Sequence, residues 1–208
     1  MNIDEYIALH SSDEPPVLQA LNRETHLTMI HPRMLSGHIL GRLLSMLVGM
    51  VKPKIILEIG TFTGYGTIAL AENLPDDGMI HTIEANPELE EHIKIWCKKA
   101  KITHKVNLHI GDALGIIPQL PNIFNMVFID ADKKNYPAYY KMVREKVSSG
   151  SIIIADNTLW DSKVLTKPAN NDADTQGIIT FNTLVKEDPG VEKVMLPLRD
   201  GVSVIRVI

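Results

Sequence analysis

Cysteine is almost absent from this chain of 208 residues, which carries a single thiol at Cys97. One thiol excludes an intramolecular disulfide and any zinc or iron–sulfur site built from several cysteines. Aromatic residues are also scarce, at 5 %, and the formal net charge of −4 shows no excess of basic groups. Without a strong positive field, a dedicated binder of duplex DNA is not expected.

Long uninterrupted hydrophobic runs are missing as well. The most apolar early stretch, residues 35–51, is interrupted by His38 and Arg42, so we expect it to be too short and too polar to cross a bilayer. The first residues show no basic segment followed by an apolar one, so no signal peptide is expected. Hydrophobic residues still make up 45 % of the chain, enough for a core. We therefore expect a soluble, cytoplasmic protein with a single domain over residues 1–208.

Short apolar runs alternate with helical patterns from residue 54 onward. The runs are typical of strands buried on both faces, and they lie at residues 55–59, 79–83, 106–110, 126–129 and 151–155. Helical spacing falls between and after them, at about 65–74, 87–100, 112–117, 137–147 and 173–187. This alternation predicts an α/β fold, with a doubly wound, mostly parallel sheet and helices on both faces.

The two ends of the chain depart from this alternation. Residues 1–50 precede the α/β core at 54–208, and their apolar spacing predicts N-terminal helices, at about 15–30 and 35–50. Near the other end, the dipeptide Asp200-Gly201 is typical of a hairpin and lies between two apolar strands, at 191–198 and 202–207. We therefore expect a C-terminal antiparallel hairpin at one edge of the sheet.

Glycine and acidic residues follow the first two parallel strands. In an open α/β sheet, ligands bind beyond the carboxyl ends of the strands. The first strand runs through Glu58 into a loop from Gly60 to Gly66, which lets the backbone approach a ligand and begins a helix. The second strand ends at Glu84, a residue suited to gripping ribose hydroxyls. A nucleoside-containing ligand is predicted, and residues 64–69 even fit the G-x-G-x-x-A pattern of nicotinamide dehydrogenases.

Polar residues after the fourth and fifth strands favour a different chemistry. Asp130, Asp156 and Asn157 form an all-oxygen set, which suits a hard cation such as Mg²⁺, Mn²⁺ or Ca²⁺. Lys133 lies three residues after Asp130, and a partly desolvated ammonium beside a cation has a lowered pKa and can serve as a general base. A dehydrogenase has no need of this cation. In addition, the first glycine of the dinucleotide pattern should directly follow the first strand, but Gly60 stands there and the pattern begins four residues later. Hydride transfer is the weaker alternative.

Three motifs resemble the metal-dependent O-methyltransferases, the family that includes catechol and caffeoyl-CoA O-methyltransferases. They are residues 57–65, 128–133 and 156–160, and the likeness runs from about Pro32 to the C-terminus. The resemblance implies a Rossmann-like methyltransferase fold, S-adenosylmethionine as cofactor, a divalent cation and a homodimer. The acceptor it implies is a small hydroxylated molecule with two neighbouring oxygens, of catechol or hydroxycinnamoyl type.

The resemblance also assigns roles to individual residues. Around the cofactor it places Met34, Glu58, Gly60, Gly64, Gly66, Thr67, Glu84, Gly111, Asp112, Ala113 and Asp130. Asp130, Asp156 and Asn157 would bind the metal, Lys133 and Asp130 would be catalytic, and Trp160 would form a wall for a planar acceptor. One position departs from the family, where a serine often grips the cofactor carboxylate. Gly66 stands there in this chain, so Thr67 or backbone N–H groups must substitute.

The same resemblance leaves a second acceptor open. Some bacterial members of the family methylate a hydroxyuridine in tRNA, and a local basic patch for RNA is available from Lys52, Lys54, Lys98, Lys99 and Lys101. The acidic net charge weighs against this alternative, so the small-molecule acceptor is preferred. A non-catalytic nucleotide-binding module is less consistent with Lys133 and three metal ligands together.

Overall fold

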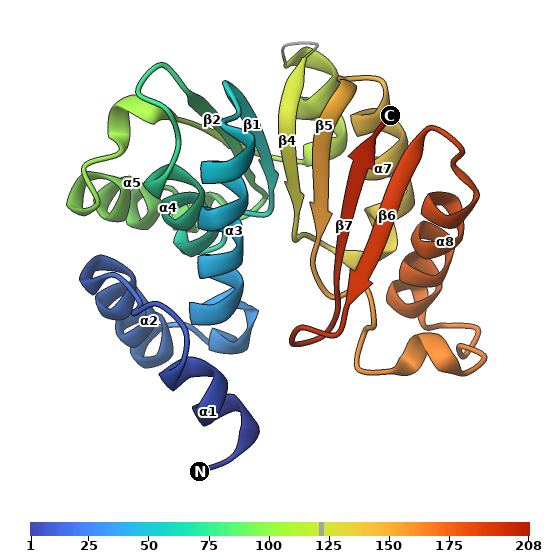
Figure 1. The fold of residues 1–208 in the computed structure, drawn as a ribbon, viewed down its shortest axis with the longest axis horizontal. Coiled ribbons are helices and arrows are strands. Elements are labelled where there is room, and N and C mark those ends of the chain that lie inside the picture. The colour runs from blue at the N-terminus through green and yellow to red at the C-terminus, as the bar shows by residue number, and fades with distance from the viewer. Residues whose placement is uncertain (121–122) are drawn as a thin grey trace.

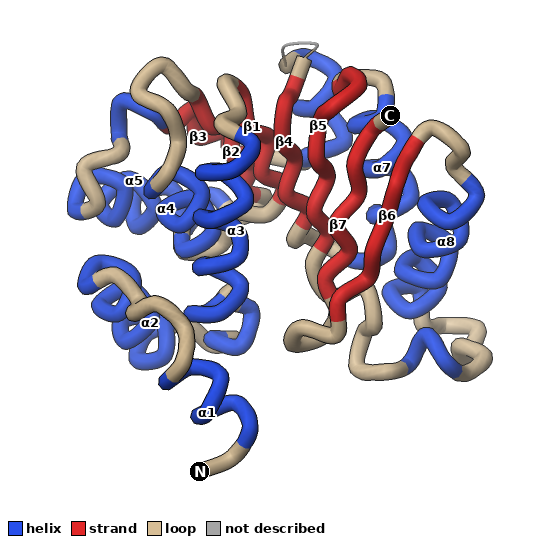
Figure 2. The backbone as a smooth tube through the Cα atoms, viewed as in Figure 1, coloured by secondary structure: helices blue, strands red, loops and turns tan. Residues whose placement is uncertain are grey.

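Seven strands form one sheet in the computed structural model, which describes residues 1–120 and 123–208. The strands are β1 (Ile55–Ile59), β2 (Met79–Glu84), β3 (Val106–Ile110), β4 (Phe124–Ile129), β5 (Val147–Ala155), β6 (Val191–Leu196) and β7 (Val202–Val207). Their order is β3-β2-β1-β4-β5-β7-β6, as Figure 2 shows. β1 to β5 pair in parallel, whereas β7 is antiparallel to both β5 and β6. The predicted sheet with its C-terminal hairpin at one edge is confirmed.

Helices cover both faces of this sheet (Figure 1). In the described ranges they are α1 (Ile3–Leu9), α2 (Pro16–Thr28), α3 (Gly37–Val51), α4 (Tyr65–Glu72), α5 (Glu90–Lys99), α6 (Ala113–Ile116), α7 (Tyr136–Arg144) and α8 (Ala173–Glu187). α1 was not predicted, because it has no buried residue and so no apolar stripe to detect. Its first turn is defined instead by a capping box between Asn2 and Glu5.

Alternate residues of each parallel strand enter two different cores. In β1, Ile56 belongs to the core that includes residues of α3, α4 and α5, whereas Leu57 and Ile59 belong to the core that includes residues of α7 and α8. Because both faces are covered, the strand has no polar side, and it reads as a continuous apolar run. Cys97 lies in the first core, as its place on an apolar helical face predicts.

Several boundaries differ from the sequence-based expectation, most clearly where α7 ends and β5 begins. β5 begins at Val147 rather than at residue 151, and its polar start at 148–150 hides it from a search for apolar runs. The ladder to β4 is irregular there, with a register shift between Phe124 and Met126. α7 ends at Arg144 because the chain turns into this longer β5.

The stretch Pro32–Val51 is longer than the apolar pattern suggested. By length and composition alone it passes a test for a membrane span, with 20 residues and a mean hydropathy of 1.5. The expectation that it is too short and polar therefore does not hold on those criteria. However, α3 packs Leu40, Leu44 and Val48 into the first core, and the core helix of a globular protein passes the same test.

Candidate active site

The carboxyl ends of the parallel strands open onto one cavity of about 940 Å³. Its walls come from the loops that follow β1 to β5 and from the segment that leads into α3. β1 lies between β2 and β4 at the point where the strand order reverses, which is where open α/β sheets bind ligands. The volume lies near the upper end of the range for small-molecule sites.

All but two of the predicted site residues line this cavity. Those present are Met34, Glu58, Gly60, Gly66, Glu84, Gly111, Asp112, Ala113, Asp130, Lys133, Asp156, Asn157 and Trp160. Gly64 and Thr67 are not among its lining residues. Gly64 begins α4 with a φ of 90°, and a Cβ there would meet Ile93 of α5. Thr67 is fully buried and donates its hydroxyl to Glu58 at 2.5 Å, so it does not replace a serine hydroxyl in the cavity.

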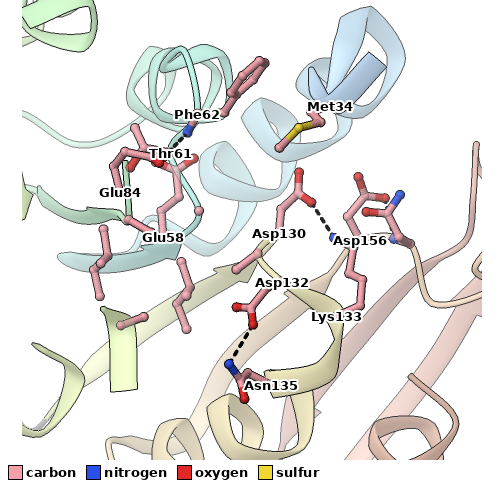
Figure 3. A pocket seen from close by; sticks show the side chains of 18 of the residues that line it. Met34, Glu58, Thr61, Phe62, Glu84, Asp130, Asp132, Lys133, Asn135 and Asp156 are labelled. Carbon is pink, nitrogen blue, oxygen red and sulfur yellow. Dashed lines mark hydrogen bonds and ion pairs between the residues drawn. The ribbon is translucent and has the colours of Figure 1, made fainter. Parts of the chain in front are cut away.

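Glu58 presents an unpartnered oxygen at the cavity (Figure 3). Its side chain is fully buried, and Oε2 accepts hydrogen bonds from Thr67 and from Thr82, at 2.5 and 2.6 Å. Oε1 has no partner among the described residues. Burial raises the pKa of Glu58 to about 8, although the two threonine hydroxyls act to lower it. A buried, unpartnered carboxylate oxygen is costly unless a donor or a cation meets it.

Gly66 is explained by the same carboxylate. A Cβ at this position would lie 2.4 Å from Glu58 Oε1, so a larger residue would force the carboxylate to move. A serine at this position, as in many members of the resembling family, would therefore require the end of the Glu58 side chain to shift in this chain. Gly60 is restricted in a similar way, because its φ is 95° and a Cβ would lie 1.9 Å from the carbonyl oxygen of Asp130.

Glu84 is fixed by the backbone at the end of β2. Its carboxylate accepts hydrogen bonds from the Phe62 N–H at 2.7 Å (Figure 3) and from the Asn86 N–H at 2.8 Å. Burial raises the pKa of Glu84, and these backbone donors oppose the shift. The side chain is therefore held in one orientation at the rim, with oxygen lone pairs left for a ligand that carries hydroxyls.

Asp130 and Asp156 bring two carboxylates together on the other side of the cavity. Asp156 is only 2 % exposed, and its pKa is raised to about 7, first by burial and then by the charge of Asp130. The N–H of Asn157 donates to Asp156 Oδ1 at 2.8 Å. No three carboxylate, imidazole or thiolate side chains cluster as a metal site in the part of the chain that the structure describes. The predicted set instead combines two carboxylates with one amide.

Lys133 lies between Asp130 and a residue that the sequence analysis missed. Its Nζ donates to Asp130 Oδ1 and to the Tyr136 hydroxyl, both at 3.0 Å. Burial alone would lower the pKa of Lys133, but Tyr136 and Asp130 raise it and prevail. Lys133 is therefore held as an ammonium. Its raised pKa is opposite to the sequence-based expectation, in which a neighbouring cation lowers the pKa so that Lys133 can act as a base. Tyr136 lies three residues after Lys133, and that spacing was the available signal.

Other residues also form walls of the cavity, and one of them, Arg199, lies in none of the predicted site motifs. Arg199 comes from the turn between β6 and β7, lines the cavity and donates a hydrogen bond to the Ser36 carbonyl just before α3. Asp132 accepts from Asn135 at 2.6 Å (Figure 3) and from the Tyr139 hydroxyl at 2.5 Å. Arg199 and Ser36 meet only because the fold brings distant segments together.

The lysines of the predicted RNA patch lie at the opposite end of the parallel strands from the cavity. Lys52 and Lys54 precede β1, and the others are at the end of α5 or just before β3, at the amino ends of the strands. Lys54 also lies 3.7 Å from Asp77, and Lys99 lies 3.8 Å from Glu24. The patch is therefore not positioned to present a nucleotide to the cavity.

Comparison with known proteins identifies similar chains over almost the full length. A family model described as O-methyltransferase matches residues 8–208. Caffeoyl-CoA O-methyltransferase 1 of Eucalyptus globulus is 36 % identical, over 80 % of this chain and 72 % of its own. The O-methyltransferase TomG of Streptomyces achromogenes, solved in complex with S-adenosylmethionine, superposes with a TM-score of 0.91 at 29 % identity, covering 99 % of this chain and 95 % of its own. The O-methyltransferase of Bacillus cereus, solved with S-adenosylhomocysteine, gives 0.91 at 28 %, covering 99 % and 97 %.

Proposed function

Since the chain belongs to the S-adenosylmethionine-dependent O-methyltransferases of the caffeoyl-CoA type, we propose that its cavity methylates one of two neighbouring oxygens on a small acceptor. Catechols and hydroxycinnamoyl-type molecules are the class that fits. The observation that carries the proposal is the pair of carboxylates of Asp130 and the buried Asp156 beside Lys133. This arrangement provides oxygen ligands and a proton acceptor on the side of the cavity away from Glu84.

The cofactor side of the cavity has the groups that S-adenosylmethionine requires. The free Oε1 of Glu58 is available to the ammonium of the methionine part, and Gly66 leaves room for it. Glu84, held by two backbone N–H groups, is available to the ribose hydroxyls. The segment from Gly111 to Ala113 would lie beside the adenine. None of these groups would meet the cofactor carboxylate. With Gly66 in place of a serine and the Thr67 hydroxyl donated to Glu58, backbone N–H groups must bind it.

A divalent cation fits the acceptor side. Asp130, Asp156 and Asn157 would hold it through oxygen atoms, the ligand type that Mg²⁺ and Mn²⁺ prefer. The charge of Asp130 raises the pKa of the buried Asp156, and a cation would relieve that repulsion. When bound, it would lower the pKa of a chelated hydroxyl group. An acceptor with a lone hydroxyl has no second oxygen to chelate, so the site selects for neighbouring oxygens.

Lys133 is the residue placed to take the acceptor proton. Its Nζ lies 3.0 Å from Asp130 Oδ1, so the base and the ligand share one corner of the cavity. To act as a base, Lys133 must first release to solvent the proton that Asp130 and Tyr136 stabilise. A cation held by Asp130 would favour that release. The reaction forms an O–CH₃ bond and breaks the S–CH₃ bond, whose electron pair returns to sulfur, while the hydroxyl proton leaves to the base. The cavity's main contribution is to hold both partners in line.

A homodimer is part of the same proposal. α1 projects from the body of the molecule (Figure 1), and its apolar residues are exposed: Ile3, Tyr6, Ile7 and Leu9. A row of exposed apolar side chains on one short helix is typical of an interaction surface. Sedimentation at micromolar concentration should show a dimer. Ile3→Ser combined with Ile7→Ser should shift it toward monomer if α1 carries the interface.

Transfer of a radiolabelled methyl group tests the function directly. Purified protein is incubated with labelled S-adenosylmethionine, Mg²⁺ and one of four acceptors: catechol, a 3,4-dihydroxycinnamoyl thioester, phenol or undermodified tRNA. We expect label in the first two and little in phenol. Label in tRNA alone would leave the O-methyltransferase class intact and overturn the proposed acceptor. Equal labelling of catechol and phenol, with or without EDTA, would contradict chelation.

A further inference from the structure

Residues 160–162 carry backbone strain beside the acceptor side of the cavity. Trp160, Asp161 and Ser162 are consecutive non-glycine residues in the left-handed region, with φ values of 47°, 52° and 61°. Trp160 lines the cavity, and its indole Nε1 is buried without a partner among the described residues. Both features are unfavourable, and they persist only where the surroundings determine the conformation.

The corner between β6 and β7 provides that constraint. The Asp200 carbonyl accepts the Leu159 N–H at 2.9 Å, and Asp200 Oδ1 accepts the Asp161 N–H. One residue therefore holds the chain on both sides of Trp160. The Gly201 carbonyl adds a bond from the Thr158 N–H at 3.0 Å.

Close packing makes the corner rigid against this segment. Gly201 has a φ of 87°, and a Cβ there would lie 2.5 Å from Leu159 Cγ and 2.7 Å from its backbone nitrogen. Behind it, the buried Ser203 hydroxyl contacts the Thr158 hydroxyl at 3.1 Å. The β6–β7 hairpin thus supports residues 158–161, at the start of the loop after β5. In this way a hairpin at the edge of the sheet helps to shape the wall of the cavity.

We propose that Asp200 is a positioning residue, which holds Trp160 in the wall of the acceptor site by accepting the Asp161 N–H. The inference rests on the proposed function for the meaning of the acceptor site, and it adds that an edge hairpin sets acceptor affinity. Removing Oδ1 frees the strained turn to relax, and Trp160 leaves the wall. The cofactor side, which is formed by other segments, is unaffected.

Asp200→Ala and Asp200→Asn separate the hydrogen bond from the charge. Asparagine keeps a side-chain oxygen that can accept the Asp161 N–H, whereas alanine does not. Asn125→Ala is the matched control, because Asn125 Oδ1 also accepts two backbone N–H groups, from Lys54 and Ile55 at 2.9 and 3.0 Å, but at the amino ends of the strands. Melting temperatures identify a variant that has simply lost its fold.

The first readout is fluorescence and does not depend on turnover. In a Trp96→Phe background, Trp160 is the single tryptophan, and its quenching by acrylamide reports exposure. We expect stronger quenching in Asp200→Ala, and quenching close to the parent in Asp200→Asn and Asn125→Ala. Unchanged quenching in Asp200→Ala, or equal increases in both Asp200 variants, would overturn the proposal even if the protein methylates none of the acceptors tested.

The second readout is a split between kinetic constants. With a 3,4-dihydroxycinnamoyl thioester as the probe, Asp200→Ala should raise the acceptor KM about tenfold, the effect of one hydrogen bond to a charged acceptor. Its Kd for S-adenosylhomocysteine should stay at the parent value. A parallel loss of cofactor affinity, or the same KM increase in Asn125→Ala, would show a general structural effect and contradict a positioning role.

Discussion

The cofactor side and the acceptor side of the cavity are built in different ways. The cofactor side comes mainly from adjacent strand ends, where Glu58, Glu84 and two restricted glycines are fixed by local hydrogen bonds and packing. The acceptor side gathers residues from distant segments, and it contains two repelling carboxylates and a strained turn. The first leaves one oxygen, Glu58 Oε1, without a partner for the proposed cofactor, whereas the second would, on the proposed function, need a cation to balance its carboxylates.

The largest expected effect is the loss of turnover in Asp156→Ala. This change removes a buried residue that we propose as a ligand of the cation, so the rate should fall at least about 10⁴-fold, corresponding to several kcal/mol of lost stabilisation of developing charge. Affinity for S-adenosylhomocysteine should not change, because Glu58 and Glu84 remain. Calorimetry and labelled-methyl assays measure the two quantities. Asp76→Ala, at an exposed carboxylate at the amino end of β2, serves as the control.

Lys133→Ala should reduce kcat by about 10²–10⁴-fold, the usual range for a general base. Raising the pH should restore part of the rate, since solvent can then remove the acceptor proton. The assay is initial rate against pH for this variant and for Lys141→Ala, an exposed lysine on α7. Near-normal turnover of Lys133→Ala at neutral pH would show that chelation alone is sufficient to remove the proton.

Glu84→Ala should act only on the cofactor side. Hydrogen bonds to a charged acceptor contribute about 1.5–3 kcal/mol, so the Kd for S-adenosylhomocysteine should rise about 10- to 150-fold. The rate at saturating cofactor should change far less. If the variant loses kcat and keeps its cofactor affinity, the division of the cavity into two sides is incorrect.

Gly177→Ala tests how the base is positioned. A Cβ on this residue of α8 would lie 2.4 Å from the Lys133 carbonyl oxygen and 2.7 Å from the Lys134 Cα. The loop must shift, and misplacement by about 1 Å can reduce a rate by up to 10²-fold. We expect a kcat about tenfold lower with cofactor affinity unchanged. In Gly115→Ala, where no atom lies within 4 Å of the added Cβ, the rate should stay at the parent value.

The smallest effect is a proton released on cofactor binding. The pKa of Glu58 is raised to about 8 by burial, so at pH 7 the free protein carries most of this proton. Pairing with an ammonium requires the ionised form, so affinity for S-adenosylhomocysteine should increase as the pH rises toward 8 and then level off. Calorimetry in buffers of different ionisation enthalpy measures the proton. Its release should disappear in Glu58→Gln, and an unchanged release would assign it to another group.

The raised pKa of Glu58 also determines whether its contribution to stability rises or falls with pH. Between the ordinary pKa near 4.5 and the folded value near 8, the unfolded chain holds fewer protons at Glu58 than the folded one. The free energy of unfolding contributed by this group therefore falls as the pH rises through that window.

The fold could be predicted from sequence because the strands are covered on both faces. Their apolar runs, together with Asp200-Gly201, are local signals, and the observed sheet agrees with them. The cofactor side was predictable for a similar reason, since a strand end followed by glycine or a carboxylate is visible in the chain. α1 gave no apolar stripe, because none of its residues is buried, and its one signal was the capping-box spacing of Asn2 and Glu5.

The rest of the acceptor side could not be predicted in this way. Arg199 reaches the cavity from a turn that the sequence identifies only as a turn, and its contact with Ser36 joins segments from opposite ends of the chain. The partners of Lys133 decide the direction of its pKa, and they depend on where α7 places Tyr136. No local pattern indicates the first fact, and only the three-residue spacing of Asp130, Lys133 and Tyr136 indicates the second.

The central claim is that the acceptor side needs a cation while the cofactor side does not. Calorimetric titration of S-adenosylhomocysteine and then of catechol, each with Mg²⁺ and with EDTA, tests it most directly. The account predicts one Kd for S-adenosylhomocysteine under both conditions, and catechol binding only with Mg²⁺. Catechol binding that is equally strong in EDTA, or cofactor affinity that is lost with the cation, would contradict it.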